Sequence, residues 1–132
     1  RKGEESPLTL AFMPAQTAIA PEVAAEIAGW LRFLGAERRM SPKTLEAYAR
    51  DVGQFLRFLA EHLGGAPSLK QLAKLTPADV RSFMAARRSD GAGNRTLMRG
   101  LAGARSFTRF LERINDLGGR ISQDFLVPLQ AA

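Results

Sequence analysis

Apolar residues recur every three or four positions along four stretches of the chain, which is the spacing of an amphipathic α-helix. The pattern predicts helices over about 21–39, 42–63, 77–88 and 94–115. Leu69, Leu72 and Leu75 predict one short helical turn in the loop before the third helix. No stretch has the alternation of apolar and polar residues typical of a strand. The predicted fold is therefore all-α, a small four-helix bundle.

Helix ends are marked by residues with the chemistry of caps. Ser41 and Thr76 each place a hydroxyl before a proline, which suits an N-cap followed by the first helical residue. Asp79 follows Thr76 at the spacing of a capping box. Asn94 is predicted to cap the last helix, and Gly64 to end the second.

The length of 132 residues suits one domain. The first segment, 1–20, has no helical period, and we expect a flexible leader or a tag remnant. Residues 21–117 form the predicted helical domain, and 118–132 a C-terminal tail or the start of a linker.

The composition excludes several classes of site. The chain has no Cys, which excludes disulfides and Cys-ligated metal sites. It has one His, too few for a His-based metal site, so no metal or other cofactor is expected. No apolar run reaches the roughly 18 residues that cross a membrane, and no secretory signal opens the chain. We expect a cytoplasmic protein with no membrane partner and no small-molecule ligand.

The positive charge is concentrated in one segment. The net charge is +6, and the stretch from Arg81 to Arg113 contains eight Arg, no Lys and two acids, so this stretch alone accounts for it. A neutral body with one basic segment is typical of a protein that binds a polyanion. A solvated surface rich in Arg has the same composition, so the charge alone leaves both interpretations open.

The helix predicted over 94–115 separates its residues into two faces. At 100° per residue, its arginines fall within about 120° of the circumference. We call these five residues the Arg face: Arg95, Arg99, Arg105, Arg109 and Arg113. The opposite, apolar arc contains Leu97, Leu101, Ala104, Phe107, Leu111 and Ile114. Glu112 is the only acid of this helix and lies at the edge of the Arg face.

Like charges four residues apart cost helix stability, by about 0.2–0.5 kcal/mol per pair. Binding of phosphates would offset that cost, which favours contact with nucleic acid. Two alternatives remain open: a carboxylate-bearing partner or neighbouring domain, and plain solvent.

Other features of the helices are predicted to be structural. Tyr48 lies on the apolar arc of its helix and is expected to pack in the core. His62 lies near a helix end, where no role as a base is expected. Gly100 and Gly103 lie inside the last helix, where close approach of another helix would explain them. The charges of the helix over 42–63 are mixed in sign, and only its start (Ser41, Lys43 and Thr44) offers donors to a phosphate.

Several segments resemble one family in order and spacing. They are WLRFL at 30–34 with ERRMS at 37–41, LEAYARD at 45–51 with FLRFL at 55–59, TPADVRSF at 76–83, and RTLMRGLAGARSFTRFL at 95–111. They are similar to conserved blocks of tyrosine recombinases of the Xer and phage-integrase type, and most similar to the XerC branch. The resemblance covers about 21–113. Ala104 and Thr108 depart from it, being smaller than the residues usual there, which predicts looser packing.

The resemblance implies a SAM-like core-binding domain that forms half of a clamp around a recombination site. Its second and fourth helices would face the major groove of double-stranded DNA, and chromosome dimer resolution is one role open to such a protein. The contacts carried over by position are Lys43, Thr44, Arg50, Asn94, Arg95, Thr96, Arg99 and Arg105. Arg109 is added because it lies on the Arg face.

The resemblance also implies where the chemistry lies. The family's tyrosine nucleophile and its Arg, Lys and His partners belong to a C-terminal catalytic domain, so we predict no catalytic residue in this chain and no DNA cleavage by it alone. In the full-length protein the partner would be a second recombinase within a tetramer. The alternative function is a helical protein-interaction module whose Arg face binds an acidic protein.

Overall fold

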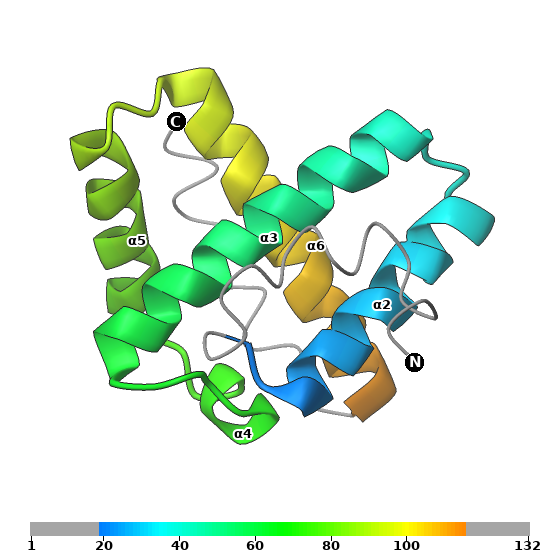
Figure 1. The fold of residues 1–132 in the computed structure, drawn as a ribbon, viewed down its shortest axis with the longest axis horizontal. Coiled ribbons are helices and arrows are strands. Elements are labelled where there is room, and N and C mark those ends of the chain that lie inside the picture. The colour runs from blue at the N-terminus through cyan, green and yellow to red at the C-terminus, as the bar shows by residue number, and fades with distance from the viewer. Residues whose placement is uncertain (1–18, 116–132) are drawn as a thin grey trace. The chain divides into compact units, whose positions relative to one another are not determined.

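The computed structural model describes residues 19–115. The predicted tail or linker over 118–132 lies outside this range, and so does the predicted leader except for its last two residues. Contacts along the chain group it into two compact units, Arg1–Ser68 and Leu69–Ala132. The part of the chain that the structure describes contains helices and no strand, which confirms the all-α prediction (Figure 1).

The first unit contains α2 (Pro21–Ala36) and α3 (Pro42–Leu63), which pack against each other. Trp30 of α2 is fully buried, and its ring stacks on Tyr48 of α3 with centroids 6.0 Å apart and planes 3° from parallel. Tyr48 itself is half-buried, so its packing role lies at the edge of this core. Ile19, which the sequence assigns to the leader, is also buried.

The helix α2 ends about three residues earlier than predicted. The Glu37 amide donates to the Phe33 carbonyl at 2.8 Å and closes the last turn. Arg39 then adopts a left-handed backbone conformation with φ of 54°, and the Met40 amide donates to the Leu34 carbonyl at 3.2 Å. This tight turn reverses the chain before α3 begins.

Both ends of α3 match the prediction. The Ser41 hydroxyl accepts a hydrogen bond from the Thr44 amide at 3.2 Å, as an N-cap should. Gly64 follows the last residue with φ of 87°, a conformation that glycine adopts without steric cost. His62 is exposed near this end and stacks on Phe58.

The second unit contains α4 (Leu69–Leu72), α5 (Pro77–Ser89) and α6 (Asn94–Asn115), of which α5 and α6 are in contact. The predicted capping box is present at the start of α5: the Thr76 hydroxyl accepts from the Asp79 amide at 3.3 Å, and the Asp79 carboxylate accepts from the Thr76 amide at 2.9 Å.

The turn between α5 and α6 is a Schellman motif. The Ala92 amide donates to the Arg87 carbonyl and the Gly91 amide to the Arg88 carbonyl, both at 3.0 Å. Gly91 has φ of 91°, which the motif requires. The motif therefore ends α5 and leads within a few residues into the start of α6.

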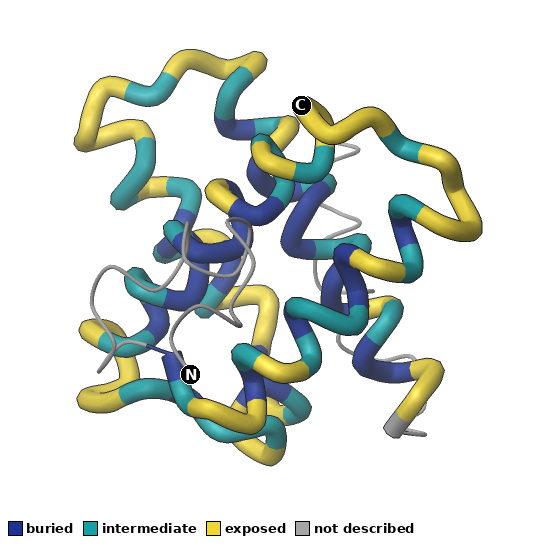
Figure 2. The backbone as a smooth tube through the Cα atoms, turned by 45° about the vertical axis from the view of Figure 1, so that its right-hand side comes forward, coloured by how far each residue is buried: buried dark blue, intermediate teal, exposed yellow. Residues whose placement is uncertain are grey.

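The helix α6 is two-faced, and its buried and exposed positions recur at helical spacing. Figure 2 shows the same mixture of buried and exposed positions along the described part of the chain. The predicted apolar arc is almost fully buried at Leu97, Leu101, Ala104, Phe107 and Leu111. Ile114 differs from the prediction, because half of its surface is exposed near the end of the helix.

Two polar residues of α6 are buried beside the apolar arc. Thr108 is 1% exposed, and its hydroxyl donates to the Arg105 carbonyl at 3.0 Å, so the smaller side chain is accommodated by a backbone hydrogen bond. Glu112 is 8% exposed rather than lying on the surface at the edge of the Arg face.

The explanation predicted for Gly100 is wrong. A Cβ atom built at Gly100 meets nothing within 4 Å, so no close helix approach requires glycine there. None of the described helices is long and apolar enough to span a membrane.

Candidate nucleic-acid interface

The Arg face of α6 is the most strongly basic surface among the predicted site residues. Arg95, Arg99, Arg109 and Arg113 are exposed, and Arg105 is half-buried. The helix period forces this arrangement: burial of the apolar arc turns residues four apart on the opposite side toward solvent. Arg113 belongs to this face by its spacing of four from Arg109 but is not among the predicted DNA contacts.

Arg105 differs from the other members of the Arg face. Its Nε atom is shielded from solvent and has no hydrogen-bond acceptor among the described residues. A buried donor left without an acceptor costs about 1–3 kcal/mol. The terminal nitrogens of the guanidinium are therefore the part of Arg105 that can reach a ligand.

The start of α6 adds backbone donors to the same surface. The Leu97 amide donates to the Gly93 carbonyl at 3.0 Å, so Gly93 is the N-cap and Asn94 is the first helical residue. The predicted capping role of Asn94 is therefore wrong by one position. The amides of Asn94, Arg95 and Thr96 have no intrahelical acceptor, which leaves three N–H groups at the positive end of the helix dipole.

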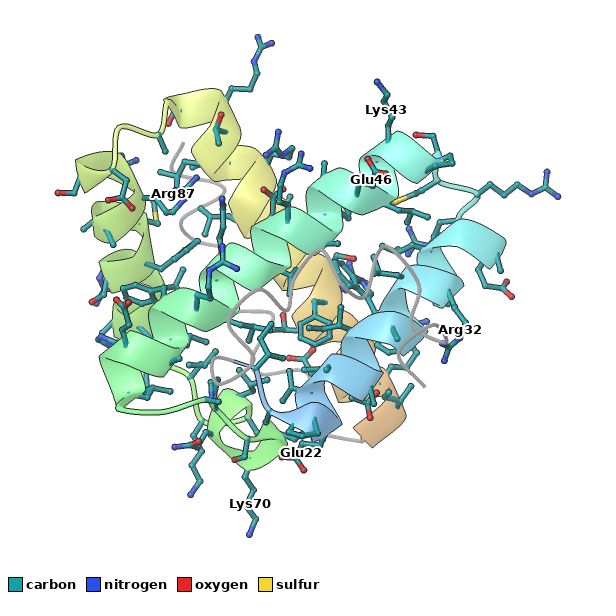
Figure 3. The ribbon with its side chains drawn as sticks, in the orientation of Figure 1. Glu22, Arg32, Lys43, Glu46, Lys70 and Arg87 are labelled. Atoms are coloured by element: carbon teal, nitrogen blue, oxygen red, sulfur yellow. The ribbon has the colours of Figure 1, made fainter. Side chains whose placement is uncertain are left out.

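The start of α3 is a smaller basic surface in the first unit. Lys43, Thr44 and Arg50 are exposed, and Figure 3 shows Lys43 extending away from the N-terminal end of the helix. The Thr44 amide is already bonded to the Ser41 hydroxyl, and Pro42 has no N–H. The first turn of α3 thus offers fewer backbone donors than the first turn of α6.

An acid interrupts this smaller surface. Glu46 is exposed, three residues after Lys43 and four before Arg50 on α3, so it lies one turn from each. Figure 3 shows Glu46 and Lys43 at the same end of the helix. Its carboxylate offsets part of the neighbouring positive charge, so the start of α3 presents less net positive charge than the Arg face of α6.

The predicted site residues fall into one group per unit. Lys43, Thr44 and Arg50 share α3, and the other six share α6: Asn94, Arg95, Thr96, Arg99, Arg105 and Arg109. Within each helix the predicted residues lie at surface or half-buried positions. No group of three or more His, Cys, Asp or Glu that could hold a metal ion occurs in residues 19–115.

Comparison with known proteins gives a consistent set of relatives. The chain is 58% identical over 93 residues to a protein of Mesorhizobium japonicum named "Tyrosine recombinase XerC", which covers 70% of this chain and 30% of that protein. Two proteins with the same name are also similar. The chain is 56% identical over 101 residues to the one from Nitrobacter winogradskyi, a match that covers 76% of this chain and 32% of that protein. It is 59% identical over 93 residues to the one from Rhizobium meliloti, a match that covers 70% of this chain and 29% of that protein. The chain spans about a third of the length of these curated relatives. No solved structure matches it.

A protein-family model also matches most of the chain. The model is described as "Phage integrase, N-terminal SAM-like domain", and the match covers residues 27–115, which include α3, α5 and α6 in full and the C-terminal part of α2. The resemblance seen in the sequence and its SAM-like, all-α fold are thereby confirmed. The chain belongs to the family of phage-integrase N-terminal SAM-like domains.

Proposed function

We propose that this chain is the DNA-binding domain of a site-specific tyrosine recombinase and that the Arg face of α6 is its main contact with duplex DNA. One observation carries the proposal. The Arg face exposes four arginines, while Glu112, the only carboxylate of α6, is buried. The exposed side of this helix therefore carries arginines and no carboxylate of its own.

The geometry of α6 suits a duplex. An α-helix fits the major groove of B-DNA, and a guanidinium can bind a phosphate or the edge of guanine through two hydrogen bonds. The free amides at the start of α6 are donors of the kind that bind phosphate at helix N-termini. Lys43, Thr44 and Arg50 of α3 supply a second, weaker set of contacts in this proposal.

The proposal assigns binding, not strand cleavage, to this domain. The named relatives are tyrosine recombinases about three times as long as the matched region, so we place the cleavage chemistry in the rest of such a protein. A second recombinase bound to the same DNA would then be the protein partner.

The Arg face can be tested by removing its charge without removing its helix. The variant Arg95→Gln, Arg99→Gln, Arg109→Gln loses three positive charges, and glutamine keeps a good helix propensity. We expect its affinity for duplex DNA to fall at least tenfold, with helical circular dichroism unchanged. The matched control Arg32→Gln, Lys70→Gln, Arg81→Gln removes the same charge from exposed positions elsewhere and should lose much less.

Two results would contradict the proposal. Equal losses in the two triple variants would mean that the chain binds DNA through its overall charge only. Negligible DNA binding by the unmodified chain, together with binding of an acidic protein through the Arg face, would favour the alternative function of a protein-interaction module.

A further inference from the structure

Arg39 has a backbone conformation that is unusual for its residue type. With φ of 54°, it is the one residue other than glycine in the described part of the chain with a positive φ. Left-handed backbone is disfavoured for residues with a Cβ atom, and glycine and asparagine tolerate it best. The conformation is imposed by the turn, because the Met40 amide must reach back to the Leu34 carbonyl.

The fold gains nothing visible from having arginine at this position. The Arg39 side chain is exposed and has no hydrogen bond, ion pair or ring contact with the described residues. Its neighbour Arg38 differs, since its guanidinium lies over the Phe33 ring, 5.8 Å from the centroid. Arg39 thus combines a strained backbone with a positive charge that contacts none of the described residues.

The charge of Arg39 lies next to a surface already assigned to DNA. The segment from 38 to 43 contains Arg38, Arg39 and Lys43, all three exposed, and no acid of its own; the exposed acids Glu37 and Glu46 lie on either side of it. Arg39 is four residues before Lys43, on the turn that leads directly into α3. Two exposed cations thus lie within four residues of each other along the chain, at the entry to α3.

We propose that Arg39 is a further DNA-contacting residue and that the α2–α3 turn binds a backbone phosphate of the duplex. This inference rests on the proposed DNA-binding function and extends it to a turn outside the predicted contacts. Because the contact is with a phosphate, it adds affinity without reading sequence.

The substitution Arg39→Asn separates binding from folding. Asparagine tolerates the left-handed conformation, so we expect the melting temperature to stay the same or rise by a few degrees. Loss of one phosphate contact should weaken DNA binding about threefold to fivefold and lower the salt slope by about 0.9. The loss should be the same for two duplexes of unrelated sequence. Arg39→Lys, which keeps the charge, should bind almost as the unmodified chain does.

The control is Arg32→Asn, which removes an exposed arginine from α2 at a distance from the turn. If the unmodified chain binds DNA and Arg39→Asn binds as tightly as Arg32→Asn, this inference is overturned while the proposed function stands. A melting temperature that falls in Arg39→Asn would show that arginine serves the turn itself, and a loss confined to one duplex would show base reading; either result also overturns it. If the unmodified chain fails to bind DNA, the proposed function fails first.

Discussion

Glu112 shows how the burial of a single carboxylate decides what a helix presents to a partner. From the sequence it lies at the edge of the Arg face, where it would neutralise part of the positive charge. In the structure it is buried, so the exposed side of α6 has no acid. Helical spacing predicts which face of a helix a side chain lies on, but a residue at the boundary between two faces can lie on either. Whether such a residue is buried therefore cannot be predicted from its spacing.

On α3, by contrast, the acid beside the predicted contacts is exposed: this is Glu46. Replacing Glu46 by glutamine removes a carboxylate one turn from Lys43 and Arg50 and keeps the side chain's size. We expect DNA affinity to rise about twofold to fivefold, with the gain shrinking at high salt as the charges are screened. The measurement is an equilibrium titration with duplex DNA at two salt concentrations.

A second glutamate on the same helix supplies the control. Glu61 is also exposed on α3, four turns further along, so Glu61→Gln changes the net charge equally at a distance from the basic start of the helix. Equal gains in the two variants would argue that Glu46 acts through net charge alone and that the start of α3 is not a contact.

At the scale of elements, the sequence predicts most helix boundaries because the signals are local. The starts of α3 and α5 are set by hydroxyl caps and prolines within four residues of each other, and both match the structure. The end of α2 does not, because the left-handed residue that stops it is an arginine and not a glycine. The end of a helix cannot be predicted from residue type when the left-handed position is occupied by a residue that rarely adopts that conformation.

The capping box of α5 gives a stability prediction. Thr76→Ala removes the acceptor for the Asp79 amide and should lower the free energy of unfolding by about 1 kcal/mol. Urea denaturation followed by circular dichroism measures the change. Thr44→Ala is the comparison: the Thr44 amide keeps its bond to Ser41, and only the exposed hydroxyl–hydroxyl bond to Ser41 at 3.0 Å is lost. An equal loss of stability there would contradict the assignment of the cap.

Two glycines of the second unit should respond in opposite directions to the same substitution. Gly91→Ala forces a Cβ atom into a left-handed conformation and should destabilise the fold by about 1–2 kcal/mol. Gly100→Ala adds a methyl group where nothing lies within 4 Å and should stabilise α6 by about 0.5–1 kcal/mol.

The pair is compared by thermal unfolding of both variants beside the unmodified chain. A destabilised Gly100→Ala would mean that the space beside Gly100 is needed and that the close packing predicted from the sequence is correct after all.

At the scale of the whole molecule, composition and family resemblance predict the fold class and where the charge is concentrated. The segment from Arg81 to Arg113 accounts for the net charge of +6, and the structure shows most of its α6 arginines exposed. What the sequence could not give is how each side chain is buried, since burial depends on contacts between segments far apart in the chain. Two residues of α6 are examples. Helical position places Arg105 on the Arg face, yet it is half-buried, and it places Ile114 on the apolar arc, yet half of its surface is exposed.

The most direct test of the central claim is the salt dependence of duplex DNA binding by this chain. If the Arg face meets phosphates, the logarithm of the binding constant should fall linearly with the logarithm of salt concentration, with a slope of about −3 or steeper. The triple variant Arg95→Gln, Arg99→Gln, Arg109→Gln should flatten that slope by about 2 to 3. An affinity that barely changes with salt, or a slope that the triple variant leaves unaltered, would contradict the account.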